Sequence, residues 1–247
     1  MLPLHLPGRA ESGILIIVDH ASNHVPEDID LGVSDSILSD HMAVDIGTWD
    51  LCHDIAERLA APAVLATVSR LVIDLNREKH APGLIPAHSD GHAIPGNATL
   101  GEDARTGRIA RFWDPYHGEV KKLIAQYRPE MLVSLHSFTP ALKSDPDQAR
   151  PWQIGVLYNE DDRAARHAIP MFSAVGAETG DNLPYSGKVL NATMNLHGED
   201  GGIAYLGLEV RQDLISTPMG VAKWGEIIAP VIAETRLRLA RQAGLPT

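Results

Sequence analysis

The chain has 247 residues, 44% of them hydrophobic, which is enough to bury a core in one large α/β domain or two small ones. Its formal net charge of −11 argues against a nucleic-acid-binding surface, and no basic run indicates an anionic membrane surface. The apolar runs are too short to span a bilayer. Met1–Pro7 lacks the features of a secretory signal, so we expect a cytoplasmic protein. The single cysteine, Cys52, excludes an internal disulfide and a cysteine-based metal site, and we expect a buried helical thiol.

The N-terminal part of the chain predicts one buried strand followed by a long helix. Residues 1–12 are expected to be irregular, and the five aliphatic residues Ile14–Val18 predict a strand buried on both faces. Ser34 is a suitable N-cap for a short helical turn. The segment Asp40–Ala60 has apolar residues near helical spacing and predicts a helix, with Asp45 in its N-terminal half.

The middle of the chain predicts extended segments, a long loop and a second helix. Ala63–Val68 predicts a strand, and Leu71–Leu75 predicts an extended segment. Lys79–Gly101 is rich in Pro, Gly and His and predicts a structureless loop, either a lid that contacts substrate or a mobile connector. Asp103–Tyr127 predicts a helix interrupted near Asp114–Pro115, because an interior proline lacks a hydrogen-bond donor.

The C-terminal half continues the alternation of strands and helices. Met131–Leu135 predicts a strand that ends in His136, and Ile203–Val210 predicts a strand that contains Glu209 near its end. The other predicted elements are a polar loop over Thr139–Arg150, a strand over Trp152–Tyr158, a helix from Asp161 or Asp162 limited by Pro170, a turn-rich segment over Gly180–Gly187 and a closing helix from Pro218 towards Arg241. This alternation predicts an α/β fold with a mostly parallel or mixed sheet covered on both faces.

Three predicted strands end in side chains that bind metals or move protons. The strand Ile14–Val18 is followed by Asp19, His20, Asn23 and His24, and the two later strands end near His136 and Glu209. Ligands bind beyond the carboxyl ends of strands in open α/β sheets, so we expect these side chains to meet. A lone strand-end histidine is more often structural. Two such histidines and a nearby glutamate are typical of a catalytic zinc with an open position.

Seven segments together resemble the N-formylglutamate amidohydrolase family, and the resemblance extends from about Ile14 to Leu214. They are Val18–His24, Ala43–Gly47, Arg70 with Ile73–Arg77, Asp114–His117, Leu135–Pro140, Asp181–Tyr185 and Leu208–Arg211. This family is similar to zinc carboxypeptidases and aspartoacylases. The resemblance implies a single domain over residues 1–247 with a three-layer α/β/α, zinc-carboxypeptidase-like (phosphorylase/hydrolase-like) fold and a mixed central sheet. It also implies one catalytic zinc ion per chain, or another divalent metal.

The resemblance also implies the metal ligands. His20 matches the first ligand of the related enzymes and His136 the later one. Those enzymes use His-x-x-Glu, whereas Asn23 stands where the glutamate is expected, and a neutral amide is a poor ligand for a hard dication. We expect Asp45 to supply the missing carboxylate, with His24 or Asn23 as alternatives.

The remaining roles follow from the same resemblance. Glu209 matches the general base, and Asn76 with Arg77 matches the clamp for a substrate carboxylate, because an arginine holds a carboxylate through two parallel hydrogen bonds. Arg211 is expected either to stabilise the oxyanion or to bind a second carboxylate. The other expected substrate-binding residues are Ser137, Asn182 and Tyr185. Purely structural alternatives are an Arg77 pair with Asp74 or Glu78, and a Glu209–Arg211 pair.

We therefore expect a zinc-dependent amidohydrolase that removes an N-acyl, such as N-formyl, group from an acidic amino acid. Its partner is a small carboxylated molecule, and neither nucleic acid nor membrane is expected. The first alternative is a zinc carboxypeptidase or amidase that acts on small peptides or cell-wall fragments. The second alternative is a non-catalytic protein that binds a carboxylated ligand.

Overall fold

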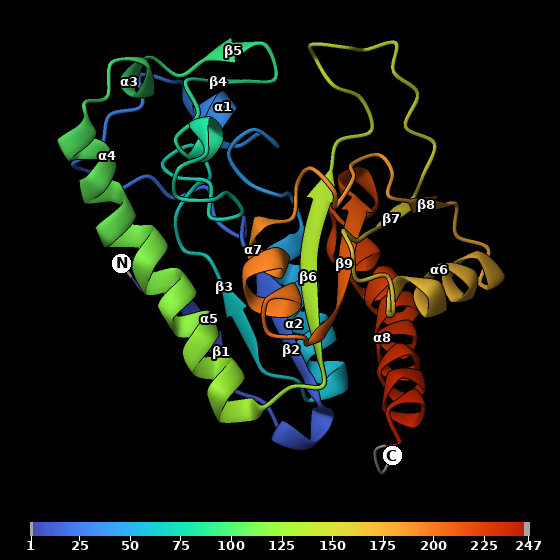
Figure 1. Ribbon diagram of the computed structural model, residues 1–247. Coiled ribbons are helices and arrows are strands. Elements are labelled where there is room, and N and C mark those ends of the chain that lie inside the picture. The colour runs from blue at the N-terminus through green and yellow to red at the C-terminus, as the bar shows by residue number, and fades with distance from the viewer. Residues whose placement is uncertain (1, 245–247) are drawn as a thin grey trace.

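The computed structural model describes residues 2–244, so Met1 and residues 245–247 of the predicted domain lie outside the described residues. The main strands are β1 (Leu4–Leu6), β2 (Ile14–Val18), β3 (Ala63–Leu65), β6 (Met131–Phe138), β7 (Ile154–Leu157), β8 (Thr179–Asp181) and β9 (Ala204–Arg211). They form a seven-stranded sheet in the order β1-β3-β2-β6-β9-β7-β8 (Figure 1). β1 is antiparallel to β3 and β7 is antiparallel to β9, whereas the other pairs are parallel. The predicted mixed sheet is confirmed.

Helices cover both faces of this sheet. They are α1 (Asp35–Leu38), α2 (Thr48–Leu59), α3 (Pro95–Ala98), α4 (Glu102–Arg108), α5 (Asp114–Tyr127), α6 (Ala165–Ala174), α7 (Ala192–Met194) and α8 (Pro218–Gln242). Residues of α2, α6 and α8 pack in one apolar cluster against one sheet face, and α5 packs in a second cluster against the other. The predicted three-layer α/β/α arrangement is confirmed.

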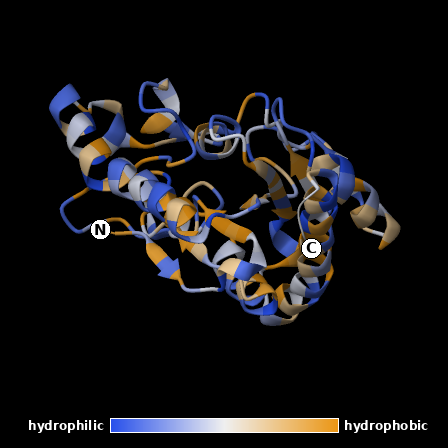
Figure 2. Ribbon diagram, turned by 60° about the horizontal axis from the view of Figure 1, so that its bottom comes forward, coloured by the Kyte–Doolittle hydropathy of each residue, from blue (hydrophilic) through white to orange (hydrophobic). Residues whose placement is uncertain are grey.

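The burial of these elements follows from their sequences. All five residues of β2 and all eight of β6 are buried, as expected of central strands in a sheet covered on both faces. α5 buries Tyr116, Val120 and Leu123, which recur at helical spacing on one side. In Figure 2 the helices carry both hydrophilic and hydrophobic residues, consistent with one buried side. Within residues 2–244, no helix is long and apolar enough to cross a membrane.

The predicted helix over Asp40–Ala60 is wrong in its first part. Residues 40–47 form turns, and α2 begins only at Thr48. Gly47 has a φ of +84°, a left-handed conformation that a continuing right-handed helix does not contain. Asp45 therefore lies on the turn that precedes the helix.

The prediction of an extended segment over Leu71–Leu75 is also wrong, because this segment contains turns. The carbonyl groups at positions 71 and 72 accept hydrogen bonds from Asn97 Nδ2 at 2.7 Å and Arg108 Nη1 at 3.0 Å. Side chains thus satisfy groups that a neighbouring strand satisfies in a sheet. The preceding strand β3 ends at Leu65, before the predicted Val68.

The segment Lys79–Gly101 has regular structure, contrary to the prediction. It contains a 3₁₀ turn (Pro82–Leu84), the hairpin β4 (His88–Ser89) and β5 (His92–Ala93), and α3. Asp90 and Gly91 connect the two short strands with φ values of +40° and +80°. Positive φ at both central residues is what a two-residue hairpin turn requires, and Asp-Gly is a preferred pair for it.

Other boundaries differ less. β1 forms within the N-terminal segment expected to be irregular, and α7, the π-helical segment 195–199 and β8 were not expected. The predicted break near Asp114–Pro115 is confirmed, since a π-helical segment (Ile109–Trp113) separates α4 from α5. Pro170 does not limit α6, which begins at Ala165 and continues to Ala174. A proline removes a single helical hydrogen bond, and buried Ala168 and Phe172 anchor the helix to the core on either side of it.

Candidate active site

The three neighbouring strands β2, β6 and β9 are parallel and bring their carboxyl ends to one edge of the sheet. His20 lies two residues beyond the end of β2. His136 and Glu209 are directly paired across β6 and β9 in the sheet register. All three side chains are buried. The structure therefore brings together the strand-end residues singled out from the sequence.

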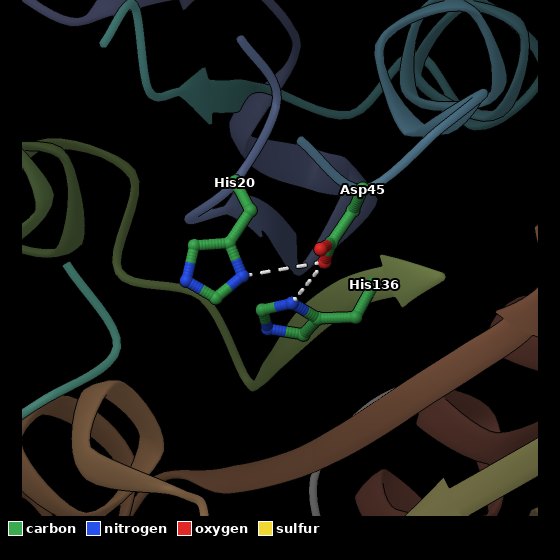
Figure 3. Close-up of side chains that lie close together, drawn as sticks. All are labelled: His20, Asp45 and His136. Carbon is green, nitrogen blue, oxygen red and sulfur yellow. Dashed lines mark hydrogen bonds and ion pairs between the residues drawn. The ribbon is translucent and has the colours of Figure 1, made fainter. Parts of the chain in front are cut away.

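His20, Asp45 and His136 form a buried group whose ligand atoms all lie within 4.8 Å of one another. Asp45 Oδ2 lies 3.3 Å from Nδ1 of His20 and 2.8 Å from Nδ1 of His136 (Figure 3). The alternative ligands Asn23 and His24 are exposed and do not belong to this group. The geometry thus favours Asp45 as the carboxylate that accompanies the two histidines.

The turn before α2 holds Asp45 in this position. The Asp45 backbone N–H donates to the His20 carbonyl at 3.0 Å, and Thr48 Oγ1 donates to the Asp45 carbonyl at 2.7 Å. A Cβ on Gly47 would lie 2.3 Å from the Ile215 carbonyl oxygen, so only glycine fits here without displacement. Residues 40–47, which form turns where a helix was predicted, therefore direct Asp45 towards the carboxyl ends of β2 and β6.

Each histidine has a second carboxylate behind its other ring nitrogen. Nε2 of His20 lies 2.7 Å from Asp74 Oδ1, and Nε2 of His136 lies 3.4 Å from Asp19 Oδ2. Tyr116 donates to the other Asp19 oxygen at 2.8 Å. Metal-binding histidines usually donate their second ring N–H to such a carboxylate, which fixes the tautomer and the ring orientation.

The local charges perturb the pKa values of this group. Burial lowers the pKa of His20 and His136, but the surrounding carboxylates outweigh it, and both pKa values are raised. Burial opposes ionisation of Asp45 as well, yet His20, His136 and Arg70 hold its pKa well below the ordinary value. The carboxylate is therefore ionised, and the site favours positive charge between the two rings.

The tautomers of His20 and His136 explain why these two rings and Asp45 fit a divalent cation. When Nε2–H of each neutral ring faces Asp74 or Asp19, the Nδ1 lone pairs of His20 and His136 face the ionised Asp45 oxygen. Lone pairs that face each other repel unless a proton or a cation lies between them. Two imidazoles and one carboxylate are also a common protein ligand set of catalytic zinc.

A cavity of about 340 Å³ opens on this group. Its wall includes five of the predicted site residues besides the three candidate ligands, namely Asn76, Arg77, Ser137, Tyr185 and Glu209. Burial raises the pKa of Glu209 to about 7, with Asp45 adding to the rise and His136 opposing it. Glu209 Oε2 has no hydrogen-bond partner among residues 2–244. The cavity thus combines the candidate metal ligands with the Glu209 carboxyl group, which has an oxygen free to bond, and with the Arg77 guanidinium.

Arg77 has a weak ion pair that leaves most of its guanidinium available. Its Nε lies 3.6 Å from Asp74 Oδ2, so one structural alternative raised from the sequence, a pair with Asp74, is present. The side chain is 32% exposed and lines the cavity. Asn76 also lines the cavity, and its Oδ1 accepts a hydrogen bond from the Thr193 N–H at 3.0 Å.

Two expected residues lie elsewhere. Arg211 pairs with Asp213 at 2.8 Å and is not part of the cavity wall in the described part of the chain. The alternative of a Glu209–Arg211 pair is therefore wrong. Asn182 is likewise outside the wall, and its Oδ1 accepts from the backbone N–H groups of Tyr158 and Gly187, both at 3.0 Å. It organises the turn that carries Tyr185.

Arg70 is a site residue to which the sequence assigned no role. Its two terminal nitrogens lie 3.1 Å from Asp45 Oδ1 and 3.0 Å from Asp74 Oδ2, and it lines the cavity. It thus links the candidate ligand to the carboxylate behind His20. Arg70 was part of the segments that resemble the family, and only the fold reveals its partners.

Three segments distant in sequence meet at the rim of the cavity. Asp90, at the tip of the β4–β5 hairpin, accepts hydrogen bonds from the Lys143 and Ser144 N–H groups, both at 2.9 Å. Asp90 Oδ2, which accepts from Lys143, also lies 3.0 Å from Nε2 of His41. His41, Asp90 and Ser144 all line the cavity. The segment Lys79–Gly101 therefore contributes an ordered wall to the site.

Comparisons with known proteins identify the family of the chain and proteins of similar fold. The family model for N-formylglutamate amidohydrolase matches residues 12–216. Gene product Atu2144 from Agrobacterium tumefaciens is 29% identical, with a TM-score of 0.84 over 94% of this chain and 92% of that one. The N-formylglutamate amidohydrolase from Ralstonia eutropha JMP134 is 18% identical, with a TM-score of 0.76 over 98% and 100% of the two chains, a likeness of fold. A search of curated proteins found no significant match.

The mixed α/β sheet and the matching family model together define a hydrolase that acts on an amide bond. The family model covers residues 12–216, which is most of the chain. The chain belongs to the N-formylglutamate amidohydrolase family.

Proposed function

We propose that this protein is a metal-dependent amidohydrolase that cleaves the N-acyl amide bond of an acidic amino acid, with N-formylglutamate as the expected substrate. The observation that carries the proposal is the convergence of both histidine Nδ1 atoms on Asp45 Oδ2, with Glu209 and Arg77 in the wall of the same cavity. Membership in the N-formylglutamate amidohydrolase family supports it.

His20, Asp45 and His136 are the residues that would hold the metal, most simply zinc. When bound, such an ion supplies Lewis acidity, which polarises a carbonyl group and makes water a better nucleophile at neutral pH. The hydrogen bond to Asp74 keeps the His20 ring oriented towards this position, and the Asp19 carboxylate lies 3.4 Å behind the His136 ring.

Glu209 is the proposed general base. Its side chain is buried beside His136 and has an oxygen without a hydrogen-bond partner in the described residues. It accepts a proton from the attacking water while the water oxygen bonds to the acyl carbon. It then donates that proton to the amide nitrogen as the carbon–nitrogen bond breaks, which releases the acyl group as a carboxylic acid and the amino acid as its amine.

Arg77 is the proposed reader of a substrate carboxylate, and Asn76 and Ser137 line the wall on which the substrate rests. Arg70 is better located than Arg211 to stabilise the oxyanion, because Arg70 lines the cavity and Arg211 pairs with Asp213. A cavity of about 340 Å³ is near the lower end for ligand pockets, which favours a small acyl amino acid over a peptide.

The test combines metal analysis with a formate-release assay. Purified protein is stripped with a chelator, reloaded with zinc, and given N-formyl-L-glutamate. We expect about one zinc per chain, hydrolysis only after reloading, and loss of both in His20→Ala and His136→Ala. Hydrolysis that persists in a metal-free double variant contradicts the metal assignment.

The same experiment separates the two alternatives. A zinc-loaded protein that hydrolyses small peptides faster than N-formyl-L-glutamate indicates the carboxypeptidase or amidase activity. A protein that binds acidic amino acids but hydrolyses none of these compounds after zinc loading indicates a binding protein.

A further inference from the structure

Arg150 is a buried cation beside the active-site cavity whose partners are all neutral. Within residues 2–244 its guanidinium donates to Gln148 Oε1, to the Thr139 carbonyl and to the Tyr185 hydroxyl. The residue is 6% exposed. By contrast, Arg70, Arg77 and Arg211 each pair with a carboxylate. A buried charge without a counter-charge is costly, and its field extends further in a region of low dielectric.

The contact with Tyr185 links the positive charge of Arg150 to a residue of the cavity wall. Arg150 Nη1 donates to the Tyr185 hydroxyl oxygen at 3.0 Å, and the guanidinium also lies 5.0 Å from the centre of the Tyr185 ring. Arg150 has no acceptor group, so the hydroxyl oxygen is the acceptor in this bond. The hydroxyl hydrogen is then available for another partner, and Tyr185 lines the cavity.

Burial raises the pKa of the Tyr185 phenol, against the opposing effect of Arg150, so the hydroxyl keeps its proton at neutral pH. A hydroxyl that accepts from a guanidinium is also polarised to be a stronger donor. Tyr185 therefore presents a proton donor, backed by a positive charge, to whatever occupies the cavity.

The turn that carries Tyr185 is held tightly enough for this role. Asn182 Oδ1 accepts two backbone N–H groups across the turn. A Cβ on Gly155 would lie 2.3 Å from the Leu183 carbonyl oxygen, so the turn packs directly on β7 where glycine leaves room. The tyrosine position is thus fixed by contacts that do not involve substrate.

We propose that Arg150 is a positioning residue that directs the Tyr185 hydroxyl towards a second carboxylate of the substrate, so that the enzyme selects dicarboxylic N-acyl amino acids. The inference rests on the proposed hydrolase function and adds to it the residue pair that reads the second carboxylate. Arg77 reads one carboxylate, and the Arg150–Tyr185 pair reads the other. The uncompensated charge of Arg150 gains its counter-charge when a dicarboxylate binds.

The test compares N-formyl-L-glutamate with N-formyl-L-glutamine, which has the same shape and lacks the second negative charge. Arg150→Met and Tyr185→Phe should each lower kcat/KM for the glutamate compound about tenfold to a hundredfold, mainly through KM, since a hydrogen bond to a charged group is lost. The glutamine compound should lose little. Arg150→Met with Tyr185→Phe should be no worse than Tyr185→Phe alone, and Arg150→Lys should restore part of the preference.

Arg166→Met, which removes an exposed arginine of α6 that pairs with Asp162, is the matched control and should keep the preference. Equal losses on both compounds, or additive losses in the double variant, would overturn the inference. If Arg150→Met does not fold, Arg150→Lys and Tyr185→Phe decide by the same comparison.

Calorimetric binding of L-glutamate and L-glutamine provides a reading that needs no hydrolysis. A wild-type protein that prefers glutamate, with the preference lost in Tyr185→Phe, supports the inference even if the hydrolase proposal fails. A wild-type protein that hydrolyses both formyl compounds without discrimination overturns the inference and leaves the hydrolase proposal intact.

Discussion

Asp74 Oδ1 lies 2.7 Å from Nε2 of His20, and the other oxygen of the same carboxylate lies 3.0 Å from Arg70. Asp74 and His20 are 54 residues apart in sequence. Burial opposes ionisation of Asp74, yet His20 and Arg70 hold its pKa well below the ordinary value. The residue behind the candidate ligand is therefore charged, and it orients the imidazole for metal binding.

Asp74→Asn should weaken zinc binding about tenfold to a hundredfold, because the amide cannot match the carboxylate as an acceptor for the imidazole N–H. The measurement is a competition titration of the metal-free protein with a zinc chelator. Asp162→Asn, which alters an exposed pair with Arg166, is the control and should bind zinc as the wild type does. Unchanged affinity in folded Asp74→Asn would show that Asp74 only anchors Arg70 and Arg77.

The parts of the site that could be predicted from sequence lie next to recognisable elements. His20, His136 and Glu209 follow or end short aliphatic runs, and parallel strands carry their ends to one edge. Arg150 could not be assigned in this way, because its contact with Tyr185 joins two loops 35 residues apart. Loop positions depend on packing that local patterns do not encode.

The difference between local patterns and packing of distant segments also explains the errors in the predicted elements. The predicted helix over Asp103–Tyr127 contains α5, whose buried residues repeat on one side. The segment Leu71–Leu75 has the composition of a strand, but Asn97 and Arg108 bind its carbonyl groups. Gly47 was a signal available in the sequence, and its left-handed conformation immediately precedes the start of α2 at Thr48.

Arg77→Ala should lower kcat/KM for N-formyl-L-glutamate at least about 30-fold. Losing a charged partner costs about 2–5 kcal/mol when the pair is desolvated, and the lower end applies because the side chain is 32% exposed. Arg77→Lys should recover only part of this loss, since an ammonium group cannot form the two parallel hydrogen bonds. A substrate whose α-carboxylate is capped as an amide should be insensitive to Arg77→Ala. An equal loss on the capped substrate would indicate that Arg77 serves the fold.

Asp90→Ala should loosen the contact between the β4–β5 hairpin and the loop after β6 without unfolding the protein. The variant removes the acceptor of the Lys143 and Ser144 N–H groups, so exchange of these two amides with solvent should accelerate at least about tenfold. The melting temperature should change little, because the contact lies at the rim. Asp145→Ala in the same loop is the control. Unchanged exchange in Asp90→Ala would mean that the loop is held by other contacts.

The His117–His197 pair should make stability fall at mildly acidic pH. His117 Nε2 donates to the Leu75 carbonyl, so its Nδ1 accepts from His197 Nε2 at 2.9 Å and the His117 ring is neutral. Burial, followed by His117, lowers the pKa of His197 to about 4. In the unfolded chain a histidine takes up its proton below about pH 6.5, so the folded state loses relative stability as pH falls from there towards 4.

The expected contribution of His197 is about 2 kcal/mol of unfolding free energy lost between about pH 7.5 and about pH 5. Urea titrations of the wild type and of His197→Gln at these two pH values measure it, since the variant keeps an N–H donor for His117 and does not titrate. The difference between the two proteins cancels the effects of His20 and His136, whose raised pKa values act in the opposite direction. A constant difference at both pH values would contradict the assignment.

Glu209→Gln should lower turnover of N-formyl-L-glutamate by about 10²–10⁴-fold, because the amide keeps the shape of the side chain and cannot accept a proton. KM should change little, since the lost interaction belongs to the transition state, and zinc content should stay near that of the wild type. Stability should not fall: Arg211 pairs with Asp213, Glu209 Oε2 has no partner within residues 2–244, and burial already disfavours the charge. Measuring kcat, zinc content and melting temperature on this variant separates catalysis from folding. A folded, zinc-loaded variant with near-normal turnover would remove Glu209 from the mechanism.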